Sequence, residues 1–374
     1  MWAKELTVIN FKNYEEASLH FLPGVNAFTG DNGAGKTNLL DALHYLSLCK
    51  SYFNPIDVQQ IRQDADFFIV QGVFEKDGED DLLACSLKRN QKKQFKRNKK
   101  DYQRLADHIG AYPLVMISPN DVAIIVEGSE ERRKFMDNVI SQTDSHYLDD
   151  LILYNKYLQS RNSLLKQQAQ HKRYDDELLS IYTEQLCEVG EKIYQKRKAF
   201  IAPFIEVFNQ HYHYLTENKE SVELSYESQL VQSSFQDLLM AALPKDRVLE
   251  RTTVGVHKDD LAFSIHGMPL KKFGSQGQQK SFLIALKLAQ YTFFCQEKGF
   301  KPLLLLDDIF DKLDEKRMRK LMQMVSADDF GQIFITDTST ERIEHTFTEI
   351  AVPIRIFEIA DGQIMGNEMY GIKV

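Results

Sequence analysis

The sequence predicts an α/β fold in which a sheet core with flanking helices carries an inserted α-helical lobe. The first indication is a pair of continuous apolar runs at residues 303–306 and 333–336, a pattern typical of strands that helices cover on both faces. The second is a long stretch rich in Leu, Tyr, Gln and Glu whose apolar residues recur with helical spacing. We therefore expect residues 1–125 and 250–374 to form one α/β domain, with residues 126–249 as the helical lobe between its halves.

The elements of the core can be assigned in chain order. Residues 6–12 alternate between apolar and polar side chains, as a half-buried strand does. Pro23 and Gly24 form a turn before a strand at residues 25–29, and leucines at helical spacing predict a buried helix at residues 39–48. Further elements are strands at residues 67–74, 82–87 and 95–97, between Pro113 and Pro119, and at residues 262–265, and a buried helix at residues 283–294.

The composition limits the possible functions. The chain has 374 residues, and its net charge of −8 arises from 46 basic and 54 acidic residues. Such a chain does not coat nucleic acid with its whole surface. No apolar run approaches the ~18 residues of a membrane span, and the first residues hold no signal-peptide core. Four cysteines lie far apart without metal or redox spacing. We therefore expect a cytoplasmic protein with reduced thiols and no membrane contact.

One motif matches a phosphate loop, G-x-x-x-x-G-K-[ST], with a predicted strand before it and a helix after it. Its residues are Gly30, Asp31, Asn32, Gly33, Ala34, Gly35, Lys36 and Thr37. Glycines let backbone N–H groups turn toward a phosphate, and the helix adds its positive N-terminal dipole. Lys36 would bridge the β- and γ-phosphates of ATP, and the Thr37 hydroxyl would bind Mg²⁺. The alternative, a Gly-rich turn that binds nothing, does not require Gly-Lys-Thr in this order.

Two adjacent acids, Asp307 and Asp308, follow the apolar strand at residues 303–306. A buried strand would deliver both to the edge of the sheet. Asp307 would hold Mg²⁺ through water, and Asp308 would orient or deprotonate the attacking water. We expect Lys36, Asp307 and Asp308 to be catalytic and Thr37 and Asp307 to be the metal ligands. The alternative is a strand that simply ends in polar residues.

A third motif opens the predicted helix at residues 283–294. It consists of Ser275, Gln276, Gly277 and Gln278, called the signature motif below. A hydroxyl and free N–H groups at a helix N-terminus bind anions. The order of phosphate loop, insertion, signature motif, paired acids and residues 311–314 (Asp-Lys-Leu-Asp) resembles the ABC-type P-loop ATPase heads of the SMC and Rad50 class.

Within that class the chain resembles the RecF family of bacterial recombination mediators. The likeness covers essentially the whole chain. It includes Asn10-Phe-Lys-Asn-Tyr14, Asn38 after the phosphate loop, Ser118-Pro-Asn-Asp121, Gly128, Arg132-Arg133-Lys-Phe-Met-Asp137 and Gln279 after the signature motif. No single segment is decisive, but their joint order is specific.

The resemblance implies an ATP-dependent homodimer that clamps DNA. ATP and Mg²⁺ would be sandwiched between two subunits, so that Ser275 and Gly277 of one chain touch the γ-phosphate bound by the other. Hydrolysis would be slow and stimulated by DNA, and would act as a switch. The resemblance also implies duplex DNA next to single-stranded gaps as the ligand, and cooperation with RecO and RecR in loading recombinase during recombinational repair, replication restart and SOS induction.

The chain departs from the family pattern at three places. Glu130 stands where we expect Pro, and residues 254–260 match the family's Gly-Pro-His-Arg-x-Asp region only in part, which weakens any role for Lys258. Thr336, Asp337 and Thr338 occupy the position where many ABC heads carry a switch histidine. We therefore expect no histidine sensor for the γ-phosphate and slow turnover.

A basic run between Lys88 and Lys100, called the basic hairpin below, holds eight basic residues in thirteen. Lys93, Lys96, Arg97 and Lys99 are candidate contacts for DNA phosphates, with Phe95 interleaved and a turn at residues 98–99. A solvated hairpin that binds nothing is the equal alternative. In the lobe, Arg132 and Arg133 favour internal ion pairs with Glu130, Glu131 and Asp137.

Four other classes of protein compete with this interpretation. A transporter ATPase subunit spaces the phosphate loop and signature motif more closely than this chain, where more than two hundred residues intervene. An SMC or Rad50 protein with long coiled-coil arms needs sustained heptads that the insertion lacks. A small-molecule P-loop kinase does not explain the signature motif. The remaining alternative is another SMC-like or ABC-type ATPase that does not act on DNA gaps.

Overall fold

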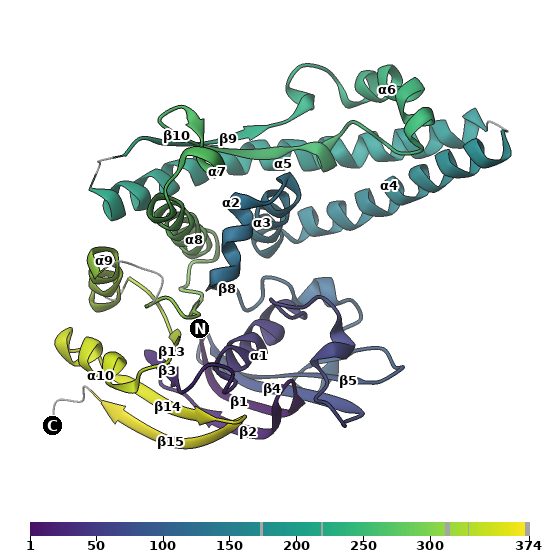
Figure 1. Ribbon diagram of the computed structural model, residues 1–374. Helices are drawn as coiled ribbons and strands as arrows, with labels where there is room; N and C mark the ends of the chain where they lie inside the picture. The colour runs from purple at the N-terminus through teal and green to yellow at the C-terminus, as the bar shows by residue number, and fades with distance from the viewer. Residues whose placement is uncertain (173–174, 218–219, 311–314, 328, 371–374) are drawn as a thin grey trace. The chain divides into compact units, whose positions relative to one another are not determined.

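The computed structural model describes residues 1–172, 175–217, 220–310, 315–327 and 329–370. The chain divides into two compact units (Figure 1). The first consists of Met1–Asp121 and Lys280–Val374, and the second of Val122–Gln279. The second boundary thus falls after Gln279, whereas the sequence predicts it after residue 249. The reason is that a strand from residues 260–265 pairs within the second unit.

One sheet of the first unit is mainly parallel and has the strand order β15-β14-β3-β13-β12-β8. Its strands are β3 (Val25–Thr29), β8 (Leu114–Ile117), β12 (Leu303–Leu306), β13 (Ile333–Asp337), β14 (Ile354–Ala360) and β15 (Gln363–Tyr370). Every residue of β3, β8, β12 and β13 is buried. Only β15 runs antiparallel to its neighbour. The continuous apolar runs therefore predict covered parallel strands correctly.

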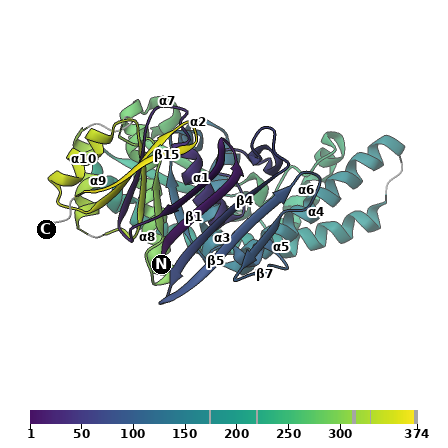
Figure 2. The same ribbon diagram turned by 90° about the horizontal axis from the view of Figure 1, so that it is seen from below.

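The second sheet of this unit is antiparallel, with the order β2-β1-β4-β5-β6-β7. Figure 2 shows β1, β4 and β5 side by side. The strands are β1 (Trp2–Phe11), β2 (Tyr14–His20), β4 (Phe67–Lys76), β5 (Glu79–Lys88), β6 (Gln94–Arg97) and β7 (Lys100–Asp101). Buried residues alternate with more exposed ones along β4 and β5, as in a sheet with one face on the core.

Helix α1 (Lys36–Leu48) lies between the two sheets, with contacts to β4 and β5 on one side and β8 and β13 on the other. Apolar side chains of both sheets and of α1 form one hydrophobic core. The remaining helices of this unit are η1 (Asp57–Gln60), η2 (Leu105–His108), α9 (Glu315–Ser326) and α10 (Thr340–Glu349). Two helices cross the boundaries between the units: η3 (Pro119–Val122) and α8 (Gln276–Lys298). The phosphate loop thus connects a fully buried strand to a helix that is buried at every residue except Thr37 and Asn38.

The second unit is largely helical, as predicted. It contains α2 (Ala123–Val126), α3 (Ser129–Thr143), α4 (Ser145–His171), α5 (Asp176–Thr216), α6 (Phe235–Leu249) and α7 (Leu270–Phe273), with η4 (Gln229–Val231) and η5 (Val256–Lys258). The long helices α4 and α5 pack side by side (Figure 1). Asp144 and Asp175 cap their N-termini by accepting bonds from backbone N–H groups of the first turn.

A small antiparallel sheet in this unit is a correction to the purely helical prediction. Strand β10 (Asp260–Ile265) pairs with β9 (Val222–Glu227) and with β11 (Met268–Pro269). The residues of β9, Val-Glu-Leu-Ser-Tyr-Glu, alternate in the manner of a strand. A local signal for this strand was therefore present within the helical region.

Arginine side chains make bonds between distant segments of the second unit. Arg197 is 1% exposed and bonds Asp259 at 2.7 Å and Asp137 at 2.8 Å. Arg132 bonds Asp260 at 2.7 Å, and Arg133 donates to the carbonyl of Asp259 at 2.6 Å. Both arginines are thus bonded internally, as expected.

The partners differ from those predicted, because Asp260 of β10 and Asp259 just before it present the acceptors. Glu130 and Glu131 pair instead with Lys134, one helical turn along α3.

The four cysteines of the chain are free thiols. Within the described residues, no helix is both long enough and apolar enough to cross a membrane.

Candidate nucleotide-binding site

The phosphate loop joins the end of β3 to the start of α1, as predicted. Gly30, Gly33 and Gly35 all have positive φ angles, of 137°, 83° and 120°. A Cβ atom on Gly30 would collide with the carbonyl oxygen of Ile359, and one on Gly35 would lie 2.9 Å from the Tyr14 hydroxyl. Both positions therefore require glycine for conformation and for space.

Side chains and backbone from β-strand ends anchor the loop. Tyr14 donates from its hydroxyl to the carbonyl of Gly35 at 3.1 Å, and Asn13 donates from its amide to the carbonyl of Ala34 at 3.0 Å. The Gly362 N–H also donates to the Ala34 carbonyl, at 2.9 Å. Burial raises the pKa of Tyr14 well above its usual value, so its hydroxyl stays protonated and remains a donor. The loop is thus preformed.

Lys36 is 8% exposed and bends back over the loop. Its Nζ donates to the carbonyl oxygens of Gly30 at 2.6 Å and Asp31 at 2.8 Å. Burial lowers its pKa, while the negative charges of Asp308, Asp337 and Asp307 oppose that shift. Within the described residues no carboxylate lies within ion-pair distance of this ammonium group. An anion therefore competes only with neutral carbonyls for it, beside the helix N-terminus.

Asp307 accepts hydrogen bonds from three hydroxyl groups, one of which belongs to the phosphate loop. Parallel neighbours β13, β12 and β8 end at the same edge of their sheet, which places three polar residues together. Asp307 Oδ1 accepts from the hydroxyls of Thr37 at 2.8 Å and Thr336 at 2.9 Å, and Oδ2 from that of Ser118 at 3.4 Å. The structure thus brings Asp307 and the phosphate loop together.

Asp307 is 5% exposed, and burial raises the pKa of its carboxyl group above the usual value although hydroxyl donors oppose the shift. Asp308 follows with a φ of 50°, and its N–H donates to the Thr336 hydroxyl at 2.8 Å. A left-handed conformation at a non-glycine residue costs energy and is typical of functional sites. Both predicted acids therefore lie at the phosphate loop's end of the sheet.

Thr336 and Ser118 were not assigned to this site from the sequence. Both are contributed by strands adjacent to β12, and sheet order was the missing information. Asp337, at the position where many ABC heads carry a switch histidine, is 1% exposed and pairs with Arg342 at 2.6 Å. Thr338 is exposed. Neither residue supplies the imidazole of a histidine switch.

The signature motif begins α8, as predicted. Ser275 is exposed and forms a reciprocal cap with Gln278: its N–H donates to Gln278 Oε1 at 2.8 Å, and its hydroxyl accepts from the Gln278 N–H at 3.3 Å. Gln278 Nε2 also donates to Glu220 at 3.3 Å. Ser275 is therefore directed to solvent and not into a core. The predicted segment 311–314 lies outside the described residues.

The basic hairpin has the predicted turn, since Asn98 and Lys99 have φ angles of 51° and 68° between β6 and β7. The four candidate cations differ in availability. Lys93 Nζ pairs with Asp57 at 2.7 Å and donates to the Cys49 carbonyl at 2.6 Å, which argues against a DNA contact.

The other three candidates are more accessible, although two are paired. Arg97 forms two bonds to Asp81, and Lys96 lies 3.8 Å from Asp101. Lys99 is exposed and has no ion-pair partner among the described residues. Phe95 is buried against Tyr102 and His108, so it does not face a ligand.

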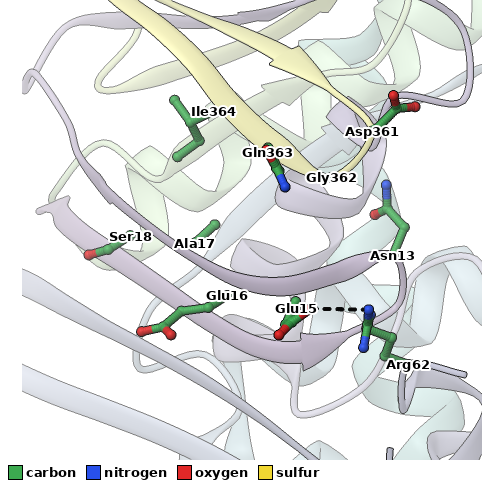
Figure 3. Close-up of a pocket in the computed structure, with 10 residues that line it drawn as sticks. All are labelled: Asn13, Glu15, Glu16, Ala17, Ser18, Arg62, Asp361, Gly362, Gln363 and Ile364. Carbon is green, nitrogen blue, oxygen red and sulfur yellow. Dashed lines mark hydrogen bonds and ion pairs between the residues drawn. The ribbon is translucent and has the colours of Figure 1, made fainter. Parts of the chain in front are cut away.

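An open pocket of about 600 Å³ (Figure 3) includes Asn13 and Gly362, which both bond the Ala34 carbonyl of the phosphate loop. It is lined by Asn13, Glu15, Glu16, Ala17, Ser18, Arg62, Asp361, Gly362, Gln363 and Ile364. Arg62 pairs with Glu15 at 3.2 Å across it. Three carboxyl groups around one paired arginine do not attract phosphate, so the anion site is the loop and not this pocket. Among the described residues no cluster of three His, Cys, Asp or Glu side chains could hold a metal ion.

Comparison with known proteins agrees with this geometry. The family model described as the RecF/RecN/SMC N-terminal domain matches residues 3–362. The DNA replication and repair protein RecF of Flavobacterium johnsoniae is 51% identical over 359 residues, covering 96% of this chain and 100% of the relative. The RecF of Phocaeicola vulgatus is 49% identical over 366 residues, covering 97% of this chain and 98% of the relative.

Solved structures give the same result. The recombination mediator protein RecF-ATP of the RecFOR pathway matches with a TM-score of 0.89 at 30% identity, covering 98% of this chain and 97% of that chain. An Smc head domain from Pyrococcus furiosus matches with a TM-score of 0.58 at 16% identity, which shows the fold alone.

The fold and the phosphate-loop site define an ABC-type ATPase head of the SMC and Rad50 class. More narrowly, the sequence relatives show that the chain belongs to the RecF family. Transporter ATPase subunits, metabolite kinases and long-armed SMC proteins are thereby set aside.

Proposed function

We propose that this chain is an ATP-driven DNA clamp that acts in DNA replication and repair. The observation that carries the proposal is the phosphate loop itself: a preformed turn with a buried lysine that no carboxylate among the described residues neutralises, next to Asp307. Its relatives are named DNA replication and repair proteins, and a similar structure is named RecF-ATP. The chain binds ATP with its triphosphate on residues 30–37.

Mg²⁺ fits the oxygen donors beside the loop. The Thr37 hydroxyl and the Asp307 carboxylate lie 2.8 Å apart, and hydroxyl, carboxylate and phosphate oxygens are the ligands this ion prefers. When bound, the ion neutralises charge that develops on the phosphates. Thr37 and Asp307 would hold the ion, Lys36 would bridge the β- and γ-phosphates, and Asp308 would orient the attacking water. Without a histidine switch, hydrolysis is slow and depends on DNA.

The signature motif acts on the nucleotide of a second copy. Ser275 is exposed at a helix N-terminus, where its hydroxyl and the N–H groups of the first turn can receive a γ-phosphate. ATP then joins two copies because its charge is satisfied only between them, and hydrolysis releases the pair. Gln276, Gly277 and Gln278 complete this interface.

DNA is the ligand of the dimer. The basic hairpin offers exposed lysines with no ion-pair partner among the described residues: Lys88, Lys92, Lys99 and Lys100. These four lysines form a surface for the phosphate backbone, bordered by Lys96 and Arg97, which are paired with Asp101 and Asp81. Gapped duplex DNA, RecO and RecR are the partners that the family implies for loading recombinase. This activity takes place in the cytoplasm, where the DNA is.

Sedimentation velocity tests the proposal directly. We expect a monomer without nucleotide and a dimer with the slowly hydrolysed analogue ATPγS. Ser275→Arg should stay monomeric while binding ATPγS as the parent does. The control is Ser180→Arg, at an exposed serine on α5, which should dimerise normally. Identical monomeric sedimentation of the parent with and without nucleotide would contradict the clamp.

Gapped duplex DNA gives a second measurement, because it should raise the rate of ATP hydrolysis. A metabolite kinase or a transporter subunit would be indifferent to it.

A further inference from the structure

The segment Ser118-Pro-Asn-Asp121 has no role in the function proposed above, yet it reaches the centre of the site. Ser118 follows β8, the parallel neighbour of β12. Leu306 pairs in register with Ile117, and the Asp307 N–H donates to the Ile117 carbonyl at 2.8 Å. Ser118 therefore lies beside Asp307 because of strand register, and its hydroxyl is 3.4 Å from Asp307 Oδ2.

Asp121 fixes the backbone at Ser118. Its Oδ2 accepts a hydrogen bond from the Ser118 N–H at 2.7 Å. Its Oδ1 accepts from the Tyr52 hydroxyl and lies 2.6 Å from Lys287 Nζ. Both oxygens of Asp121 are thus occupied.

The charge pair beneath Ser118 is deeply buried. The side chains of Lys287 and Asp121 are 7% and 3% exposed. A buried ion pair rarely adds stability compared with apolar residues of similar size, because both charges lose their hydration. A buried ion pair that is costly in free energy, and in which both Asp121 oxygens are bonded, fixes a specific geometry. That geometry is the position of Ser118 beside Asp307.

Lys287 also belongs to the helix that carries the signature motif. Helix α8 starts at Gln276 and continues without interruption past Lys287 to Lys298. A rigid helix transmits a shift at one turn to the others. Through this ion pair, Asp121 is linked to the helix that Ser275 immediately precedes in the chain.

We propose that Ser118, Asp121 and Lys287 are positioning residues that orient Asp307 and couple its state to helix α8. Ser118 holds the second oxygen of Asp307, leaving the first for Thr37 and Thr336. Asp121 and Lys287 hold Ser118. This inference rests on the proposed function, since it concerns the same ATP and Mg²⁺ site and the same signature motif.

The first test compares Ser118→Ala with Ser118→Thr. Removing the hydroxyl leaves Asp307 less restrained. We expect Ser118→Ala to lower kcat about tenfold with KM unchanged within about twofold, because the missing interaction acts on orientation and not on ATP binding. Ser118→Thr keeps a hydroxyl and should recover most of the rate. A purely structural serine would show neither the split between kcat and KM nor the recovery.

A binding readout accompanies this rate measurement. At equilibrium, the Mg²⁺ concentration for half-maximal ATPγS binding should rise about threefold or more in Ser118→Ala, as expected when a hydrogen bond that orients a metal ligand is removed. If both kcat and the Mg²⁺ requirement of Ser118→Ala match the parent, the inference is overturned.

The second test addresses coupling through the buried pair. The double variant Asp121→Asn, Lys287→Met removes both charges together, which avoids leaving one buried charge unpaired. We expect its thermal midpoint to stay near that of the parent while dimerisation with ATPγS weakens about tenfold, as typical coupling free energies imply. The control is Lys298→Met, at a partly exposed lysine on the same helix.

Dimerisation of the double variant equal to that of the parent would overturn the coupling. If this variant fails to fold, the Ser118 pair still decides the inference. The two proposals fail separately: a parent that never dimerises with ATPγS contradicts the clamp, whereas a dimerising parent with an indifferent Ser118→Ala contradicts only the positioning role.

Discussion

The phosphate loop and the basic hairpin each hold a lysine in a confined place, and the two lysines have opposite surroundings. Lys36, 8% exposed, donates only to the neutral carbonyls of Gly30 and Asp31 among the described residues. Lys93, with 12% of its side chain exposed, donates to the carboxylate of Asp57. A phosphate can displace neutral carbonyls easily, but it must break an existing ion pair to bind Lys93. The partner of a cation therefore decides whether it binds an anion.

The largest expected difference between Lys36 and Lys93 is in the affinity for ATP. Lys36→Met should lower the affinity for ATP by about 100-fold or more, roughly 3 kcal/mol, because a charge-assisted bond to the phosphates is removed. Lys93→Met should leave ATP affinity unchanged. Isothermal titration with ATPγS measures both. Equal losses in the two variants would show that the different surroundings of these lysines do not matter.

A pH change acts on the helix behind the phosphate loop. Burial lowers the pKa of His44, on α1, and of His108, which bonds the Leu46 carbonyl of α1, to about 4. The ordinary value is 6.5. Between these two values the unfolded chain binds more protons than the folded chain. Stability is therefore complete above pH 6.5 and falls as the pH drops, by roughly 3 kcal/mol for the pair between pH 7 and pH 5.

The single tryptophan, Trp2, lies in β1 of the first unit, so its fluorescence reports on the unfolding of that unit. Urea unfolding followed by its fluorescence should show a lower midpoint at pH 5 than at pH 7. His108→Gln should reduce the difference, since one of the groups that must stay neutral in the folded chain is gone. An unfolding midpoint that is the same at both pH values would show that neither histidine must stay neutral.

A smaller effect is expected on the stability of the first unit, to which Lys93 should contribute more than Lys99. Lys93→Met removes a charged bond to Asp57 and leaves that carboxylate without its cation, so it should lower the stability of the first unit by about 1–2 kcal/mol. The urea midpoint of Trp2 fluorescence detects this loss. Lys99→Met, at an exposed residue without an ion-pair partner among those described, is the matched control and should change the midpoint very little.

The parts of the site that the sequence predicts are those whose residues lie next to one another in the chain. The phosphate loop is contiguous, so its glycines, Lys36 and Thr37 were all visible together, and the apolar strand before Asp307 marked that acid. Thr336 and Ser118 were missed because they join Asp307 only through the order of parallel strands. Nothing local reveals that order.

In the basic hairpin, the sequence likewise does not show that Lys93 is paired, because a count of charges leaves out the partner of each cation. Asp57 lies 36 positions before Lys93 in the sequence and is brought to it by the fold. By contrast, β9 had a local alternating pattern that the surrounding helical texture obscured. The sequence therefore predicts what one segment determines, and leaves open what two distant segments form together.

The smallest expected effect is on DNA affinity, where Lys93 and Lys99 of the basic hairpin should differ. The slope of log affinity against log salt falls by about one for each cation that no longer neutralises a phosphate. Lys99→Gln should therefore reduce the slope by about one and weaken the affinity a few-fold. Lys93→Gln should not change it, because this ammonium is already paired with Asp57. Fluorescence anisotropy with a gapped duplex at several salt concentrations measures both slopes. A reduced slope for Lys93→Gln would mean that DNA displaces Asp57, and an unchanged slope for Lys99→Gln would remove the hairpin tip from the DNA surface.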